Sequence, residues 1–246
     1  MIIGNNNFNN NNFTNKFNRI KKEGERNKER LNPTLVDKKA FNYGNTKSKQ
    51  EDQIMNKLQG KDLINVGIFT AIYFVVMMAI AMLGFIPIFL PLLIVLVPLI
   101  GGIVMMLYYS KVQKFGMVSL TGLICGILML LTGMGYWSII TGAVFGVLAD
   151  LVLKSGDYKS AKKGIISHGV FSMWIIGNYI PIVATRDSYY QQLISGYGQE
   201  YADSIMSYIS AYTLPLLLIA GFVCGVIGGV IGQKIFKKHF KRAGIA

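Results

Sequence analysis

From residue 63 onward the chain consists mainly of long runs of apolar residues separated by short polar segments. Each run carries almost no charge and is about as long as the roughly 20 helical residues that cross the hydrocarbon core of a bilayer. The runs are continuous, whereas the strands of a membrane barrel alternate apolar and polar residues. The pattern predicts an all-α integral membrane protein with six transmembrane helices, at Leu63–Leu83, Ile86–Tyr109, Phe115–Leu131, Trp137–Leu153, Gly164–Ala184 and Thr213–Phe236.

Residues 1–54 have a different character, because they are rich in Asn, Lys and Arg and show no sustained helical or strand period. Such a segment cannot bury enough apolar surface to offset the entropy lost on ordering it. We therefore expect a disordered amino-terminal segment, 1–54, followed by a transmembrane domain, 55–246. Gln50-Glu51-Asp52 can be encoded by a purine-rich run that resembles a bacterial ribosome-binding site, so a start at Met55 is an alternative.

The charges give the expected orientation. The chain is 52% hydrophobic and only 15% charged, whereas about 25% of a typical soluble domain is charged, so an ordinary soluble enzyme is not expected. From Lys57 onward, 13 Lys and Arg residues flank the predicted spans on one side, and the opposite side holds only Arg186. The positive-inside rule then places both termini in the cytoplasm of a bacterial cell, with the protein in the plasma membrane. Because the cations sit between apolar runs, the net charge of +13 does not imply a nucleic-acid partner.

The side opposite the lysines is aromatic. Its longest loop, 186–212, holds three acidic residues and six tyrosines: Tyr189, Tyr190, Tyr197, Tyr201, Tyr208 and Tyr212. The spacing of several of these residues predicts a short amphipathic helix on the membrane surface. An interfacial aromatic belt is the ordinary interpretation of such tyrosines, and a lid over an external pocket is the alternative.

The sequence contains no recognisable catalytic arrangement. It has no phosphate-binding glycine loop with its lysine, no HExxH motif, no paired-cysteine metal site and no supported Ser/His/Asp set. Cys125 and Cys224 lie inside apolar runs, where they are expected to be buried, inert thiols. We therefore expect neither an enzyme nor a site for a metal or cofactor.

A small set of polar and aromatic residues is expected in the outer halves of the spans and just beyond them. Its members are Tyr136, Trp137, Trp174, Asn178 and Arg186. An aromatic wall with a few directed hydrogen-bonding groups can hold a small organic ligand, so these five are the predicted substrate-binding residues. Asn178 is the sharpest candidate, although an amide inside a span could equally pair with another helix.

Small residues and prolines mark places where helices can approach each other or bend. Gly67 and Ala71 in the first span, like the glycines at 221, 225 and 229 in the last, follow the four-residue spacing that favours close helix packing, internal or with another subunit. Prolines at 87, 91 and 98 interrupt the second span, which predicts a kink or a cavity wall. Asp150 and His168 lie near the lysine-rich ends of their spans, where we expect solvation or pairing with Lys.

Four segments of the chain carry a resemblance to a known family. They are KLQGKDLINVGIFTA at 57–71, KVQKFG at 111–116, GVLADL at 146–151 and IGQKIFKKHFKRAG at 231–244. From about residue 55 to 246 the chain resembles the S components of energy-coupling-factor (ECF) transporters, within them the Trep_Strep (MptD-like) type.

The resemblance implies a six-helix ECF S-component-like bundle that captures a vitamin-like or related small metabolite from outside. It implies partnership with a membrane-embedded T component and two ATP-binding subunits, since this chain has no ATP site. The family's small-residue contact with the T component maps onto Gly67 and Ala71. The sequence thus predicts the substrate-binding subunit of an ECF-type ABC importer.

Two other functions have less support in the sequence. A stand-alone proton-coupled secondary transporter would use Asp150 or His168, but the sequence shows no acidic residue at the membrane midplane. A membrane-embedded enzyme acting on lipid would need clustered polar groups at the interface, which the sequence does not show.

Overall fold

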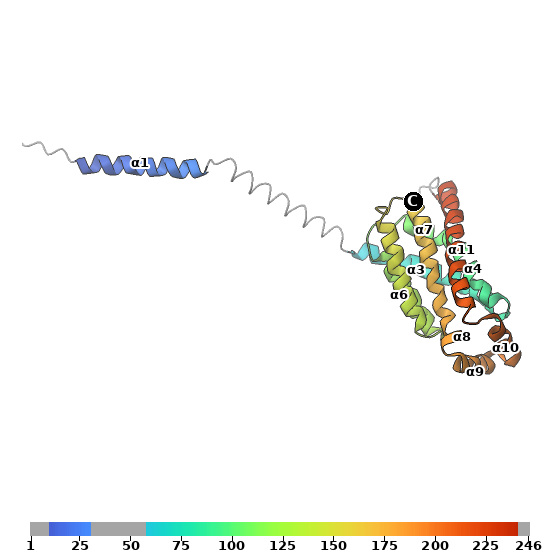
Figure 1. Ribbon diagram of the computed structural model, residues 1–246. Helices are drawn as coiled ribbons and strands as arrows, with labels where there is room; N and C mark the ends of the chain where they lie inside the picture. The colour runs from blue at the N-terminus through green and yellow to red at the C-terminus, as the bar shows by residue number, and fades with distance from the viewer. Residues whose placement is uncertain (1–9, 31–57, 241–246) are drawn as a thin grey trace, which may run out of the picture. The chain divides into compact units, whose positions relative to one another are not determined.

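The computed structural model describes residues 10–30 and 58–240, and the chain divides into two compact units, Met1–Met55 and Asn56–Ala246 (Figure 1). In the first unit, α1 (Asn10–Arg30) is helical, although the sequence predicted no regular structure there. Lys, Arg and Glu are strong helix formers, which explains the difference. The side chains described in α1, including Phe17 and Ile20, are exposed, so this helix contributes no core. The rest of the segment expected to be disordered lies outside the described residues.

The second unit is an all-α bundle over its described residues, which confirms the predicted fold class. Its elements are α3 (Gly60–Ala81), η1 (Met82–Phe85), α4 (Phe89–Tyr109), α5 (Met117–Leu131), α6 (Trp137–Lys154), α7 (Ala161–Ser172), η2 (Met173–Asn178), α8 (Ile180–Ala184), α9 (Arg186–Tyr197), α10 (Gln199–Tyr208), α11 (Thr213–Ile235) and η3 (Phe236–Phe240). Within the described chain, five helical stretches are long and apolar enough to cross a membrane, and one apolar helix, α5, is shorter.

Two of the six predicted spans differ in form: the span Gly164–Ala184 is divided into α7, η2 and α8, and α5 is shorter than the other membrane-spanning stretches. Helix α5 contains 15 residues, which corresponds to about 22 Å of helix, against a hydrocarbon core of about 30 Å. Backbone geometry limits it at both ends, because Gly116 before it and Gly133 after it have φ values of 100° and 90°. Such left-handed values are not helical, and glycine adopts them without steric cost.

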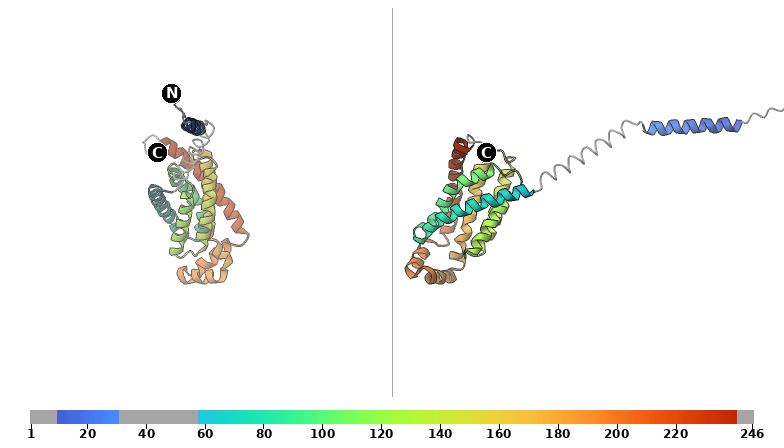
Figure 2. Two further views of the ribbon diagram at one scale, coloured as in Figure 1. Left: turned by 90° about the vertical axis from the view of Figure 1, so that its left-hand side faces the viewer. Right: turned by 180° about the vertical axis from the view of Figure 1, so that it is seen from behind.

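The helices of the bundle form a closed ring. Going round it, α3 packs on α5, α5 on α6, α6 on α7, α7 on α11, α11 on α4, and α4 returns to α3, while α4 also contacts α7 across the interior. Figures 1 and 2 show α3 crossing the other helices obliquely. Only 28% of the apolar window of α3 and 22% of that of α11 is buried, so these two helices have the largest surfaces available to lipid or a partner.

Glycines allow the backbones of α4 and α11 to touch. A Cβ added at Gly228 would collide with the Pro98 carbonyl oxygen and lie 2.9 Å from the Leu99 Cα, and one at Gly102 would collide with the Gly228 backbone. On another side of α11, a Cβ at Gly225 would lie 2.8 Å from the Gly169 Cα of α7. The glycines of the last span therefore serve packing inside the bundle, where close backbone contact replaces the missing hydrophobic driving force.

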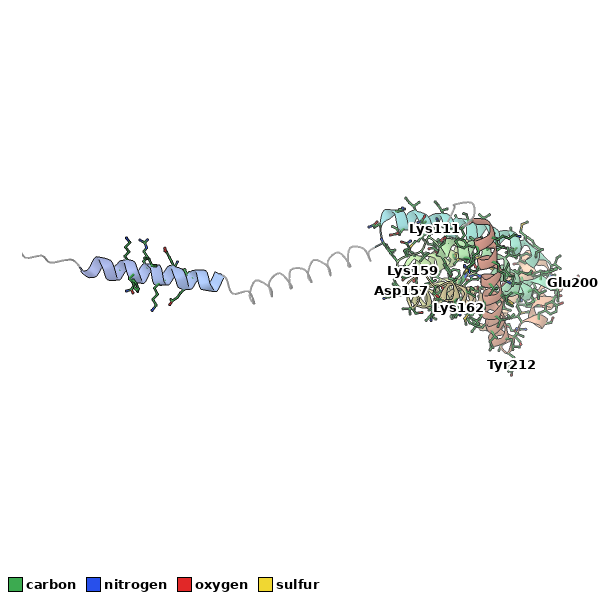
Figure 3. The ribbon with its side chains drawn as sticks, turned by 90° about the horizontal axis from the view of Figure 1, so that it is seen from above. Lys111, Asp157, Lys159, Lys162, Glu200 and Tyr212 are labelled. Carbon is green, nitrogen blue, oxygen red and sulfur yellow. The ribbon has the colours of Figure 1, made fainter. Side chains whose placement is uncertain are left out.

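The two ends of the bundle differ in chemistry. The connections between α4 and α5 and between α6 and α7 hold Lys111, Lys114 and Lys159, and Lys162 lies in the first turn of α7. Lys114 pairs with Asp62 of α3 at 2.8 Å. We call this the basic end. The opposite end, which we call the tyrosine end, is formed by η1, α9 and α10 (Figure 1). Figure 3, a view from above, labels Lys111, Lys159 and Lys162 and shows Glu200 of α10 set apart from them.

Candidate ligand-binding cavity

A cavity of about 270 Å³ lies at the tyrosine end of the bundle. Its wall comes from segments far apart in the sequence: the end of α3 with η1, the start of α4, the end of α5, η2 and the two short helices α9 and α10. The lining residues are Met77, Met78, Ala81, Met82, Gly84, Phe85, Leu90, Leu93, Val97, Met129, Thr132, Met134, Ile175, Asn178, Tyr179, Tyr189, Leu193, Tyr197 and Tyr201.

The helices α9 and α10 are tied to η1 beside the cavity. The Tyr201 hydroxyl donates a hydrogen bond of 2.6 Å to the Gly84 carbonyl oxygen. The Tyr197 ring stacks on Tyr201 at 4.9 Å between centroids and contacts Phe85 at 6.1 Å. These tyrosines therefore form the part of the cavity wall beside η1, whereas Tyr212, at 88% exposure, fits the aromatic-belt interpretation.

Arg186, one of the five predicted binding residues, supports this roof from outside the cavity. Its guanidinium donates to the Met206 carbonyl oxygen at 2.8 Å and to the Ile209 carbonyl oxygen at 3.1 Å. These carbonyls lie at the carboxyl end of α10, where a cation is favourable because the helix dipole places partial negative charge there. Arg186 thus fixes α10 relative to α9, and it is not among the residues that line the cavity.

Asn178 lines the cavity at the end of η2. Its side-chain oxygen accepts a hydrogen bond of 2.6 Å from the Ser138 hydroxyl of α6, so both the ligand-facing position and the expected pairing with another helix occur together. The contact requires η2 to lie directly against α6. Gly177 permits this approach, because a Cβ there would stand 2.8 Å from the Ser138 Cα. The Thr141 hydroxyl adds a hydrogen bond of 2.8 Å to the Trp174 carbonyl oxygen.

The other three predicted residues lie away from the cavity lining. Trp174 is fully buried in the bundle beside Phe171, with ring centroids 6.4 Å apart. Tyr136 and Trp137 stack on each other at 5.1 Å, and Tyr136 is 57% exposed. The structure therefore brings only Asn178 of the five to the cavity, and ligand contact by the set stays a prediction.

Sequence reasoning missed the methionines of the wall. Five of the chain's 12 methionines line the cavity: Met77, Met78, Met82, Met129 and Met134. Their concentration near the tyrosine-end termini of the first and third apolar runs was a visible signal. Methionine is flexible and polarisable and makes favourable contacts with aromatic rings, which suits a wall that must adapt to a ligand.

The wall has no formally charged side chain among its residues, all of which belong to the described chain. Its tyrosines stay neutral at physiological pH, because burial raises the pKa of Tyr189 to about 12 and also raises the pKa of Tyr201. The described residues also hold no group of three or more His, Cys, Asp or Glu side chains placed to bind a metal. The cavity can therefore hold a ligand by dispersion, ring contacts and hydrogen bonds.

The two ionisable residues inside the spans are buried and bonded to backbone. Asp150 Oδ2 accepts hydrogen bonds from the Gly116 N–H at 3.0 Å, the Ser119 N–H at 2.8 Å and the Ser119 hydroxyl at 2.6 Å. These bonds supply an acceptor for backbone N–H groups at the start of α5. His168 Nε2 lies 3.0 Å from the Pro98 carbonyl oxygen of α4. The expectation of solvation or pairing with Lys was wrong, because each side chain is fully buried and meets a backbone group of another helix instead.

The predicted partner-contact residues lie on the outside of the bundle. Gly67 and Ala71 are exposed on α3, and a Cβ at Gly67 would meet nothing within 4 Å. The same face carries Ile64, Ile68 and Val75, which are 62%, 52% and 67% exposed. In contrast to the glycines of α11, this small-residue pair has no packing role within the described bundle.

The chain was compared with proteins and structures already known. No curated protein and no solved structure matches it. The sequence model of one family does match, over residues 60–242, which cover the entire bundle. The chain thus belongs to the Trep_Strep family, described as hypothetical bacterial integral membrane proteins.

Proposed function

We propose that this chain is the substrate-binding membrane subunit of an ECF-type importer. The observation that carries the proposal is the cavity at the tyrosine end, which η1, α9 and α10 help to wall and which lies opposite the lysine-rich end. If the basic end faces the cytoplasm, as the positive-inside rule requires, the cavity opens toward the outside of the bacterial plasma membrane. It would there capture a vitamin-like or related small metabolite.

The proposed partners are a T component in the membrane and two ATP-binding subunits. The outward face of α3 supports a membrane partner, because Gly67 and Ala71 leave room for the backbone of another helix to approach. Apolar side chains that flank the pair, such as Ile68, would add contact area. Transport would then couple ATP use in the partners to release of the ligand.

The test is purification of the tagged chain from its native membrane in mild detergent, followed by mass spectrometry of the proteins that accompany it. We expect a T-type membrane protein and two ATPases, and we expect the double variant Gly67→Leu, Ala71→Leu to lose them. Val223→Phe is the matched control, since Val223 is 46% exposed on α11, away from the α3 face. Recovery of the chain alone, with ligand uptake that continues in cells lacking the ATPases, would contradict the proposal.

The stand-alone proton-coupled transporter has less support. Asp150 and His168 would be its proton carriers, yet both bond to backbone atoms of neighbouring helices. Uptake that stops with an uncoupler while cellular ATP is maintained would favour this alternative.

A further inference from the structure

The charge of the ligand can be inferred from the absence of countercharge around the cavity. No Asp, Glu, Lys, Arg or His occurs among its lining residues, which all lie in the described chain. The four charged residues of α9 and α10 lie outside the lining. Arg186 binds carbonyls at the end of α10, Asp203 accepts a hydrogen bond of 2.6 Å from Tyr190, and Asp187 and Glu200 are exposed. A charged ligand would give up hydration without meeting an opposite charge, which is strongly unfavourable in an apolar site.

The wall also restricts the shape of the ligand. Methionine thioethers such as Met77 and Met129 and the rings of Tyr179 and Tyr197 form much of its surface. Sulfur and aromatic groups both interact favourably with a flat, polarisable ring. A cavity of about 150 Å³ holds benzene, so a cavity of about 270 Å³ has room for a substituted or fused ring.

One polar group of the wall is oriented by the protein. The Asn178 side-chain oxygen accepts the Ser138 hydroxyl at 2.6 Å, which fills one of its two acceptor positions and fixes the amide so that its N–H₂ group can donate to a ligand. Two other polar groups already donate to backbone carbonyls: the Tyr179 hydroxyl to Leu90 at 2.7 Å and the Tyr201 hydroxyl to Gly84 at 2.6 Å. A ligand therefore needs an acceptor, such as a carbonyl oxygen or ring nitrogen, to use the Asn178 amide.

We propose that the cavity binds a small uncharged ring compound whose hydrogen-bond acceptor is held by the Asn178 amide, with Ser138 as the positioning residue. This inference rests on the proposed function, because it names the class of substrate for that site. It assigns selectivity to two features: the uncharged wall rejects ions, and the Ser138–Asn178 pair recognises the acceptor.

The test uses four probes that share one ring and differ in a single group. They are indole-3-acetamide, which is uncharged with an acceptor, indole-3-acetate, which is anionic, tryptamine, which is cationic, and 3-ethylindole, which has no acceptor. Dissociation constants are measured by calorimetry on the purified full chain in detergent, without partners. We expect indole-3-acetamide to bind at least 100-fold more tightly than the two ions and about tenfold more tightly than 3-ethylindole.

Variants separate recognition from folding. Asn178→Leu should weaken indole-3-acetamide binding about tenfold and leave 3-ethylindole binding unchanged, and Ser138→Ala should give a smaller loss of the same kind. Ser172→Ala is the control, since Ser172 is a buried serine whose hydroxyl bonds to its own helix at the His168 carbonyl oxygen, away from the cavity lining. A general loss of fold would weaken the binding of both uncharged probes equally. The ratio of their two dissociation constants therefore isolates the effect of the acceptor.

Three outcomes would overturn the inference. They are binding of an ionic probe as tight as that of indole-3-acetamide, no binding by any of the four, and equal loss of both uncharged probes in Asn178→Leu. These binding measurements do not depend on the co-purification experiment. The proposed importer function can fail while the uncharged-ligand site is confirmed, and the ligand site can fail while the importer function is confirmed.

Discussion

Asp150 provides a sharp test of how the bundle is stabilised. Its Oδ2 accepts two backbone N–H groups, from Gly116 and Ser119, and the Ser119 hydroxyl, at 2.6 to 3.0 Å. These are donors at the start of α5 that have no partner within their own helix. Asp150→Ala would remove the acceptor of both N–H groups, which are partly buried.

The magnitude follows from the two backbone N–H groups. A buried unsatisfied backbone group costs about 1–3 kcal/mol, and these two groups are partly buried, so Asp150→Ala should lower the free energy of unfolding by about 2–4 kcal/mol. Asp150→Asn keeps one acceptor oxygen and loses only the charge assistance, which corresponds to about 1–2 kcal/mol. Ser119→Ala removes a single hydroxyl bond and should cost about 1 kcal/mol.

The assay is reversible unfolding in mixed micelles, followed by tryptophan fluorescence. Asp157→Asn is the control, because Asp157 is exposed at a φ of 49° that Asn tolerates, and its effect should stay within about 0.5 kcal/mol. If Asp150→Ala cost no more than this control, the capping role would be refuted. If Asp150→Asn folded normally but abolished uptake, the proton-coupled alternative would regain support.

Three further predictions concern packing and the roof of the cavity. Tyr108→Phe should cost about 1 kcal/mol, since its hydroxyl donates to the Met117 carbonyl oxygen at 2.9 Å, whereas Tyr212→Phe, at a ring that is 88% exposed, should leave stability unchanged. Equal losses in the same unfolding assay would contradict this. Gly228→Ala should lower the free energy of unfolding by about 1–3 kcal/mol, because the added methyl group overpacks against α4. Gly67→Ala is the control, since its methyl group meets open space and should not destabilise the bundle. A Gly228→Ala variant of unchanged stability would refute the close contact. Tyr201→Phe removes the hydroxyl that bonds to η1, so it should speed dissociation of indole-3-acetamide severalfold in stopped-flow measurements. An unchanged dissociation rate would contradict a role of this bond in retaining the ligand.

Much of the bundle was predictable because apolar runs end where polar residues begin. The predicted span Trp137–Leu153 differs from α6 by one residue, and the second predicted span ends at Tyr109, as α4 does. The third predicted span, Phe115–Leu131, likewise ends where α5 ends. The division of the fifth predicted span, Gly164–Ala184, into α7, η2 and α8 was less accessible, since a change from α to 3₁₀ winding leaves the apolar pattern unbroken.

The cavity was only partly predictable. Asn178 could be singled out because an amide is unusual inside an apolar span. A methionine such as Met129 could not, because it does not differ from the other apolar residues of the pattern. Arg186 was expected to contact substrate, and its bonds to the end of α10 became visible only when α9 and α10 were folded against each other. Wall residues drawn from several distant segments meet only through tertiary structure.

The six residues of η2 set the direction in which Asn178 points. A 3₁₀-helix turns about 120° and rises about 2.0 Å per residue, against about 100° and 1.5 Å for an α-helix. Over Met173–Asn178 the difference accumulates to about a third of a turn and about 3 Å of length. A continuous α-helix from Ala161 to Ala184 would therefore turn the Asn178 amide to another side of the helix. It would also place α8 closer to α7 along the helix axis. The winding of one short segment thus sets both the reach of this span and the direction of its amide.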